Sequence, residues 1–255
     1  MSNRNDFSME IKSSILKDII QALHVVDDET LWRITPEGVN TRMVDPAHVL
    51  MADLSMSRHA CESYEGGDKS IAFSLSKLQD VLMLSKKDEM VTLENNNGQE
   101  KLHVRFGPIH RRIPLLDQET MKTPSDFPKV DWTVKTTLKS ETFQMALKAT
   151  CQVNPDSFTI EAVKNELRFH SEQDLDDVSI KLVNGESGQL SLLDVSADSV
   201  AMYSQDYMDM TLKAAHGDST VSAEFATDNP MLVSYGFADE TVSVKYMIAP
   251  RVDSE

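Results

Sequence analysis

The sequence predicts an α+β protein made of two similar halves. Two observations support this prediction. A segment with the apolar spacing of an amphipathic helix is followed by strand-like segments, and this alternation occurs four times in the 255 residues. The second half also keeps the spacing of the first, since fifteen positions separate Phe73 from Asp88 and fifteen separate Tyr203 from Asp218. An internal duplication with an offset of about 130 residues explains both observations.

The first predicted helix covers residues 13–26, and either Ser13 or Ser14 is the expected N-cap. Its apolar side chains recur at helical spacing along one face. They are Ile15, Leu16, Ile19, Ile20 and Leu23. Strands are expected from residue 31 onward and over 49–56, with a turn at the intervening TPEG.

A second helix is predicted over residues 74–85, with Ser74 or Ser76 as its cap. Its apolar face consists of Leu75, Leu78, Val81 and Leu82. The following run, 89–106, has the alternation of two strands, and the asparagine- and glycine-containing segment 96–98 predicts the turn between them.

The second half repeats this order. A helix is predicted over 139–150, with Phe143, Ala146 and Leu147 on its buried face, and another over 204–215. The expected strands are a hairpin over 157–171 and the segments 177–183, 189–195, 220–237 and 241–250. Between the halves, residues 117–130 contain two prolines and few apolar residues, which predicts an extended connector.

The composition is that of an acidic chain, with a formal net charge of −16. This acidity argues against a protein that grips nucleic acid with its whole surface, but it permits contact on one restricted face. The longest apolar runs are far shorter than a bilayer span, and the polar N-terminus lacks a secretion signal, so a cytoplasmic location is expected. In a reducing cytosol, Cys61 and Cys151 are expected to be buried small hydrophobic residues.

No sequence motif indicates an enzyme. The chain contains no GxSxG, GxxxxGK[ST], HExxH or glycine-rich dinucleotide loop, and its seven histidines are scattered. The acidic run 174–177 lacks the glycine of a calcium loop, so neither a metal nor a cofactor is expected. A catalytic group assembled only in space stays open as an alternative.

Four segments, in the right order on a duplicated frame, resemble a known family. They are VDPAHVLMADLSM (44–56), RRIPLLD (111–117), DLDDVSIKL (174–182) and VKYMIAPRVDSE (244–255). The chain resembles, from about Phe7 to its end, the sliding clamps of archaeal and eukaryotic DNA replication, the proliferating-cell-nuclear-antigen type.

The resemblance implies the fold and the function. Two clamp domains, 1–116 and 131–255, flank the connector 117–130, and each has two helices on a curved antiparallel sheet. Three copies close into a ring around duplex DNA, which is bound without sequence preference. The ring raises processivity by tethering DNA polymerase, and also flap endonuclease and DNA ligase, through short peptide motifs, after a clamp loader has placed it on DNA. It has no catalytic residue, no membrane partner and a nucleoid-associated location. The alternative is one subunit of a heterotrimeric clamp, or a clamp-like scaffold that does not encircle DNA.

The basic run 103–112, HVRFGPIHRR, is unusual in so acidic a chain. The resemblance implies that the edge strand 108–114, which carries His110, Arg111 and Arg112, pairs with the acidic strand 175–183 of the next copy, through backbone hydrogen bonds and opposite charges. The simpler alternative is that Arg111 and Arg112 only keep a strand edge soluble. The implied subunit-interface residues are His110, Arg111, Arg112, Ile113, Asp174, Asp176, Asp177 and Ile180.

Two further sites follow from the resemblance. The lysines expected to face DNA are Lys12, Lys17, Lys77, Lys86, Lys87, Lys148 and Lys213. Lysine suits sliding because a flexible point charge contacts phosphate without reading bases. The acidic residues Asp18, Asp80 and Asp206, with Met83, make this lining mixed. The residues expected in a partner-peptide groove are Val44, His48, Met51, Met121, Thr123, Pro124, Pro230, Met247, Ala249 and Pro250. Ordinary solvated lysines and core methionines are the alternatives.

Overall fold

The structure, a computed structural model, describes residues 6–96, 99–121, 124–184 and 190–251. It divides into two compact units that exchange short segments. Unit 1 contains Met1–Pro46, Ala52–Ser125 and Ala238–Val244, and unit 2 contains Ala47–Met51, Asp126–Phe237 and Lys245–Glu255. No helix among the described residues is long and apolar enough to cross a bilayer. The domain limits at 116 and 131 stay a prediction.

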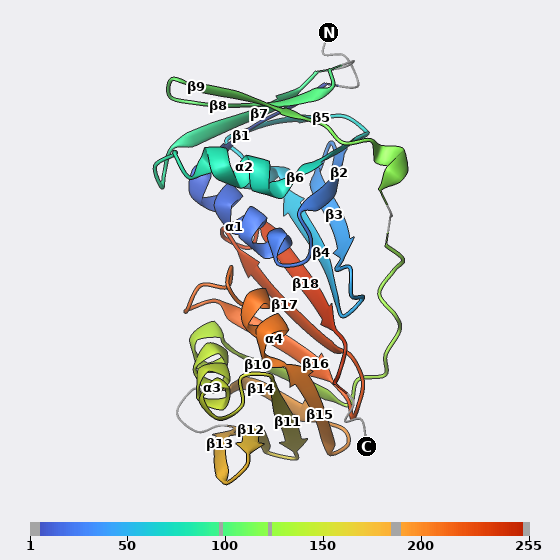
Figure 1. Cartoon of the computed structure of the whole chain (residues 1–255), viewed down its shortest axis with the longest axis vertical. Coiled ribbons are helices and arrows are strands. Elements are labelled where there is room, and N and C mark those ends of the chain that lie inside the picture. The colour runs from blue at the N-terminus through green and yellow to red at the C-terminus, as the bar shows by residue number, and fades with distance from the viewer. Residues whose placement is uncertain (1–5, 97–98, 122–123, 185–189, 252–255) are drawn as a thin grey trace. The chain divides into compact units, whose positions relative to one another are not determined.

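The secondary structure repeats itself once, as the spacing of the sequence predicts (Figure 1). The first repeat consists of β1 (Phe7–Lys12), α1 (Ser13–His24), β2 (Glu29–Thr35), β3 (Gly38–Val44), β4 (Leu50–Ser57), β5 (Ser63–Gly66), β6 (Lys69–Ser74), α2 (Leu75–Leu82), β7 (Met90–Asn95), β8 (Lys101–Phe106) and β9 (Ile109–Pro114). The second consists of β10 (Val134–Lys139), α3 (Ser140–Val153), β11 (Ser157–Val163), β12 (Glu166–Gln173), β13 (Asp176–Val183), β14 (Leu190–Val195), β15 (Ser199–Ser204), α4 (Gln205–Thr211), β16 (Thr220–Phe225), β17 (Met231–Phe237) and β18 (Val242–Ile248).

The strand order is repeated as well. In the first repeat, one sheet has the order β5-β1-β7-β8-β9, and four more strands follow the order β6-β2-β3-β4. In the second, the corresponding orders are β14-β10-β16-β17-β18 and β15-β11-β12-β13. Element by element, β9 is therefore the counterpart of β18, and β4 is the counterpart of β13. The predicted duplication is confirmed at the level of topology.

The core of unit 1 lies between its helices and its sheets. The alternation of β1 buries Phe7, Met9 and Ile11 on one face of the strand. The buried stripe of α1 contains Leu16, Ile19, Ile20 and Leu23, as its periodicity predicts. On α2 the four predicted apolar residues are all buried, and α1 and α2 lie side by side (Figure 1). Burial of this apolar surface is the main favourable contribution to folding.

The N-termini of α1 and α3 are not capped by side chains, so the predicted cap at Ser13 or Ser14 is wrong. Backbone carbonyls of the loop before β7 accept these amides instead: the N–H of Ser13 donates to Glu89 (2.8 Å) and that of Ser14 to Lys87 (3.0 Å). In the second repeat, Ser140 and Glu141 donate to Ser219 and Gly217 in the same way (2.8 and 3.0 Å). The helix starts are thus satisfied by distant backbone.

Helix α2 is capped as predicted, because the Ser74 hydroxyl accepts the N–H of Lys77 (3.3 Å). Helix α4 is shorter than the predicted 204–215 and ends at Thr211. Beyond that point the amides of Lys213 and Ala215 bond three residues back, to Met210 and Leu212, so the chain continues in tight turns.

Both cysteines are free thiols and only half-buried, which corrects the expectation of full burial. Cys61 directly follows a short 3₁₀ turn, Arg58–Ala60, and Cys151 lies in the last turn of α3. Burial still raises the pKa of the Cys61 thiol to about 11, so this sulfur stays protonated and unreactive at neutral pH.

Candidate functional site

Strand β9 is an open edge of unit 1. It is the last strand of its five-stranded sheet and pairs with β8 in the register Arg105↔His110 and His103↔Arg112. The side chains of His110 and Arg112 are exposed and Arg111 is half-buried. Ile113 is only 1% exposed, so its side chain packs into its own unit, and its place at a subunit interface stays a prediction. Within the described part of the chain no strand pairs with the outer side of β9, and basic side chains accompany this edge.

Strand β13 is an open edge of unit 2. It is the last strand in the order β13-β12-β11-β15, and among the described residues it pairs with β12 alone. The tight turn before it places Asp174 in the left-handed region, with φ of 57°. Asp174, Asp176 and Asp177 are exposed, and Ile180 is half-buried. The predicted acidic strand is therefore an edge strand with its carboxylates in solvent.

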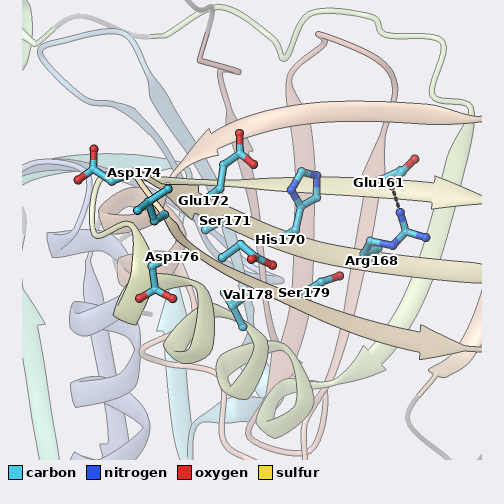
Figure 2. A pocket seen from close by; sticks show the side chains of 11 residues that line it. Glu161, Arg168, His170, Ser171, Glu172, Asp174, Asp176, Val178 and Ser179 are labelled. Carbon is cyan, nitrogen blue, oxygen red and sulfur yellow. Dashed lines mark hydrogen bonds and ion pairs between the residues drawn. The ribbon is translucent and has the colours of Figure 1, made fainter.

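A hollow of about 480 Å³ lies on the solvent face of β11, β12 and β13 (Figure 2). At one end the Arg168 guanidinium is held by two carboxylates, Glu161 (2.7 Å) and Glu166 (2.6 Å), which offset its positive charge. Glu172, Asp174 and Asp176 line the other end, as Figure 2 shows. The rim beside the β13 edge consequently has a negative potential.

The duplication relates these two edges to a pairing inside the chain. The counterparts of β9 and β13 are β18 and β4, and those two strands are neighbours in the nine-stranded sheet. Within unit 1 the N–H of Ser57, on β4, donates to the carbonyl of Thr241, just before β18 (2.8 Å). Within unit 2 the N–H of Ala249 donates to Val49 (2.9 Å). The backbone of this fold thus already supports one pairing of the β9–β13 type.

The predicted DNA-facing lysines lie on or beside the helices. In unit 1, four of them are exposed: Lys12, Lys77, Lys86 and Lys87. Lys17 is half-buried and donates a hydrogen bond from Nζ to the carbonyl of Ser85 (3.0 Å). Its ammonium group is therefore partly engaged within unit 1 and less available to a phosphate. In unit 2, Lys148 on α3 and Lys213 after α4 are exposed.

The exposed helix faces are mixed in charge, as the sequence indicates. On α2 the exposed residues include Lys77 and Asp80, and Met83 directly follows the helix with 75% exposure. On α3, and on α4 and the turn after it, exposed methionines again lie between an acid and a lysine; these residues are Glu141, Met145, Lys148, Asp206, Met210 and Lys213. Each helix face therefore offers few positive charges to a polyanion.

The predicted groove residues lie in both units. In unit 1, Val44, Met121 and Pro124 are half-buried, and Thr123 lies outside the described residues. In unit 2, His48 is exposed with φ of 57°, and four residues are half-buried: Met51, Pro230, Ala249 and Pro250. Met247 is 4% exposed, so its side chain belongs to the core, and the prediction that it lines a docking surface is wrong.

Comparison with known proteins identifies the family of this chain. The family model described as "Proliferating cell nuclear antigen, N-terminal domain" matches residues 8–122, and the one for the C-terminal domain matches residues 126–251. The chain belongs to the proliferating cell nuclear antigen family. The predicted resemblance is confirmed, and with it the fold of two similar domains, each with two helices on antiparallel sheets.

Individual relatives agree with this assignment. The "DNA polymerase sliding clamp" of Methanococcoides burtonii is 28% identical over 250 residues, which cover 98% of this chain and all of the relative. A solved family member from Thermococcus kodakaraensis is 25% identical with a TM-score of 0.87, over 96% of this chain and all of that one. The structure titled "C-terminal region of FEN-1 bound to A. fulgidus PCNA" has a TM-score of 0.90 at 20% identity, over 98% of this chain and all of that one.

Two features of the site were missed by the sequence analysis. One is a contact between His103 and His110, whose ring nitrogens lie 3.2 Å apart on adjacent strands. The run 103–112 contains both residues, but only the register of β8 and β9 brings them together. The other is the carboxylate of Asp28, which supports the start of α2 from 48 positions away. The Asp28 contact is long-range and has no local signal, whereas the two histidines are only seven positions apart but meet only in the register of the β8–β9 hairpin.

Proposed function

We propose that this chain is a DNA polymerase sliding clamp that works as a closed homotrimer at the nucleoid. One observation carries the proposal: β9 and β13 are open edges whose counterparts, β18 and β4, are neighbours in one sheet. Pairing β9 of one copy with β13 of the next repeats that arrangement between copies. Such a head-to-tail contact closes into a ring when the rotation permits.

Opposite charges favour this pairing over others. His110, Arg111 and Arg112 fringe one edge, and Asp174, Asp176 and Asp177 fringe the other. Backbone hydrogen bonds between the edges supply affinity and register, as in other strand additions. The charges accelerate encounter and disfavour contacts between like edges. Each exposed ion pair contributes only about 0–1 kcal/mol, so the charges adjust the stability of the ring and do not stabilise it by themselves.

The proposed action on DNA is non-enzymatic. The exposed lysines of the helices contact phosphates without reading bases, which allows the ring to slide on any sequence. The mixed helix faces, with exposed acids and methionines between the lysines, keep this grip weak. Encirclement, and not contact strength, keeps the ring on DNA.

Partner enzymes are tethered through the half-buried groove residues described above. The proposed partners are replicative polymerase, flap endonuclease, DNA ligase and the clamp loader, each through a short peptide motif. The FEN-1 segment bound to the family member from A. fulgidus supports this mode of docking. Tethering raises processivity because the bound enzyme stays at high effective concentration near its substrate.

The decisive test distinguishes encirclement from ordinary binding. The labelled chain is loaded onto nicked circular DNA by its clamp loader with ATP, free protein is removed, and retention is followed before and after the circle is cut by a restriction enzyme. Retention on the circle and rapid loss after cutting are expected. Equal retention on circular and linear DNA would contradict encirclement, and failure to load with a trimer present would contradict the clamp function itself.

A further inference from the structure

Two histidines meet on the solvent face of the five-stranded sheet. The Nδ1 atom of His103, on β8, lies 3.2 Å from the Nε2 atom of His110, on β9, and the ring centroids are 5.3 Å apart. His103 is half-buried and His110 is exposed. The two strands hold this arrangement through six consecutive residue pairs, so the imidazoles are presented by a regular ladder and not by a loop.

This separation matches that of two ligands on one metal ion. Zn–N bonds of about 2.0–2.1 Å at a tetrahedral angle place two ligand nitrogens about 3.3 Å apart. We propose that His103 and His110 form a two-histidine chelate for a borderline divalent transition-metal ion, of which Zn²⁺ is the reference. The ion would lie between the two ring nitrogens and replace their mutual hydrogen bond. This site does not depend on the proposed function, because both residues belong to one unit of one copy.

A metal ion would bind the neutral form of both imidazoles, through the lone pair of one nitrogen on each ring. The ion therefore competes with protons for these two nitrogens. Metal binding at this pair is consequently expected to weaken as the pH falls.

The charges around the pair limit the affinity without excluding the ion. Arg105, opposite His110 in the ladder, is held by Glu94 on β7 at 2.8 Å, which offsets its charge. Arg112, opposite His103, is exposed, so water and salt screen it. Among the described residues no group of three or more His, Cys, Asp or Glu is arranged for a metal. Water would therefore complete the coordination, and the ion would exchange readily.

The ligand chemistry of the site favours some metal ions over others, and metal binding would change the edge of the sheet. Imidazole ligands suit Zn²⁺, Cu²⁺ and Ni²⁺ and do not suit Mg²⁺ or Ca²⁺, which prefer oxygen. Binding would join β8 to β9 by a side-chain bridge beside the open edge. It would also add two positive charges to the basic fringe of that edge.

The test uses isothermal titration calorimetry of the full, tag-free chain with ZnCl₂ at pH 7.5, with Mg²⁺ as the comparison ion. One Zn²⁺ per chain is expected, and ring resonances of two of the seven histidines should shift in NMR spectra. The variants His103→Gln and His110→Gln should each weaken Zn²⁺ binding by about tenfold or more, because one imidazole alone loses the chelate. Lowering the pH to 5.5 should weaken it by about tenfold or more, since both rings must be neutral.

His59→Gln is the matched control, because His59 is an exposed histidine of the same unit and should leave the titration unchanged. Arg112→Gln should strengthen Zn²⁺ binding by removing a neighbouring positive charge. Circular dichroism checks that each variant is folded. If one of the two glutamine variants is unfolded, the other glutamine variant and the NMR shifts of the parent chain test the site. Absence of binding up to millimolar Zn²⁺, or equal binding by both glutamine variants and the parent chain, would overturn the proposal.

Discussion

Asp28 shows how one side chain can connect two distant segments. Its carboxylate accepts the N–H of Ser76 (2.7 Å) and the hydroxyl of Ser74 (2.8 Å), at the start of α2, while its carbonyl accepts the N–H of Leu75 (2.7 Å). Burial alone would raise the pKa of this carboxyl group, but the hydrogen bonds from Ser76 and Ser74, together with nearby His24, lower it overall. The folded state therefore favours the charged form.

This lowered pKa makes the contribution of Asp28 dependent on pH. A depressed carboxyl pKa stabilises the fold above the unfolded value of about 3.9, and this stabilisation is lost as the pH falls through the lower folded value. Asp28→Ala is expected to reduce the free energy of unfolding by about 1 kcal/mol at pH 7, and by less at pH 3. Urea denaturation at both pH values measures the difference. Asp80→Ala, at an exposed acid of α2, is the control and should change little.

At this scale the sequence predicts some contacts and not others. Ser74 is confirmed as the cap of α2 because its partner, Lys77, is only three positions away. The cap predicted for α1 is wrong because the carbonyls that satisfy its first amides come from residues more than seventy positions along the chain. Met247 is a core residue for a similar reason, since the tertiary packing around β18 decides its burial.

At the scale of elements, the two edge strands are the features on which the proposed assembly depends. The sequence locates both within one residue of their observed starts, because alternation and charge are local properties. It does not predict the hollow beside β13, since that surface needs the register of three strands at once. Nor does it predict the His103–His110 pair, which depends on the ladder between β8 and β9.

Charge reversal on one edge tests the pairing of edges. The double variant Arg111→Glu with Arg112→Glu removes two attractions and adds repulsion, and it should weaken trimer formation by roughly 10- to 100-fold, at about 1 kcal/mol per pair. Adding Asp176→Arg and Asp177→Arg to the same chain should restore the trimer. Sedimentation analysis reads out both. Arg33→Glu, at an exposed arginine of the inner strand β2, is the control, and a failure of the rescue would show that these charges do not meet.

At the scale of the whole molecule, the duplication favours the proposed assembly and the net charge opposes it. Each copy carries a formal charge of −16, so bringing three copies together costs electrostatic self-repulsion. The attraction between the basic and acidic edges is local, because it is strongest where the two edges face each other. Long-range repulsion and local attraction are both screened by salt, over a Debye length of about 8 Å at physiological ionic strength.

A salt series separates these effects. At moderate salt the purified chain is expected to have a mass near three times 28.6 kDa. Higher salt should loosen the trimer only modestly, because backbone pairing and apolar contacts do not depend on charge. Light scattering coupled to size-exclusion chromatography over a range of salt concentrations gives the mass. A monomer at micromolar concentration under all conditions would argue against self-assembly.

The sequence predicts the duplication but not the exchange of segments between the units. Order and spacing are visible in a linear chain, and the sheet orders of the two repeats confirm them. Which short segment packs with which unit depends on contacts between residues roughly two hundred positions apart, for which no local pattern exists.

That exchange has a practical consequence for anyone who wishes to dissect the protein. Unit 1 needs Ala238–Val244 from near the C-terminus, and unit 2 needs Ala47–Met51 from near the N-terminus. A gene cut at the connector would give two fragments, each of which lacks a segment that its fold requires. Each fragment would also expose a new strand edge that can pair with other chains and cause aggregation. Co-expression of both fragments, and not either one by itself, is the route to material that stays in solution.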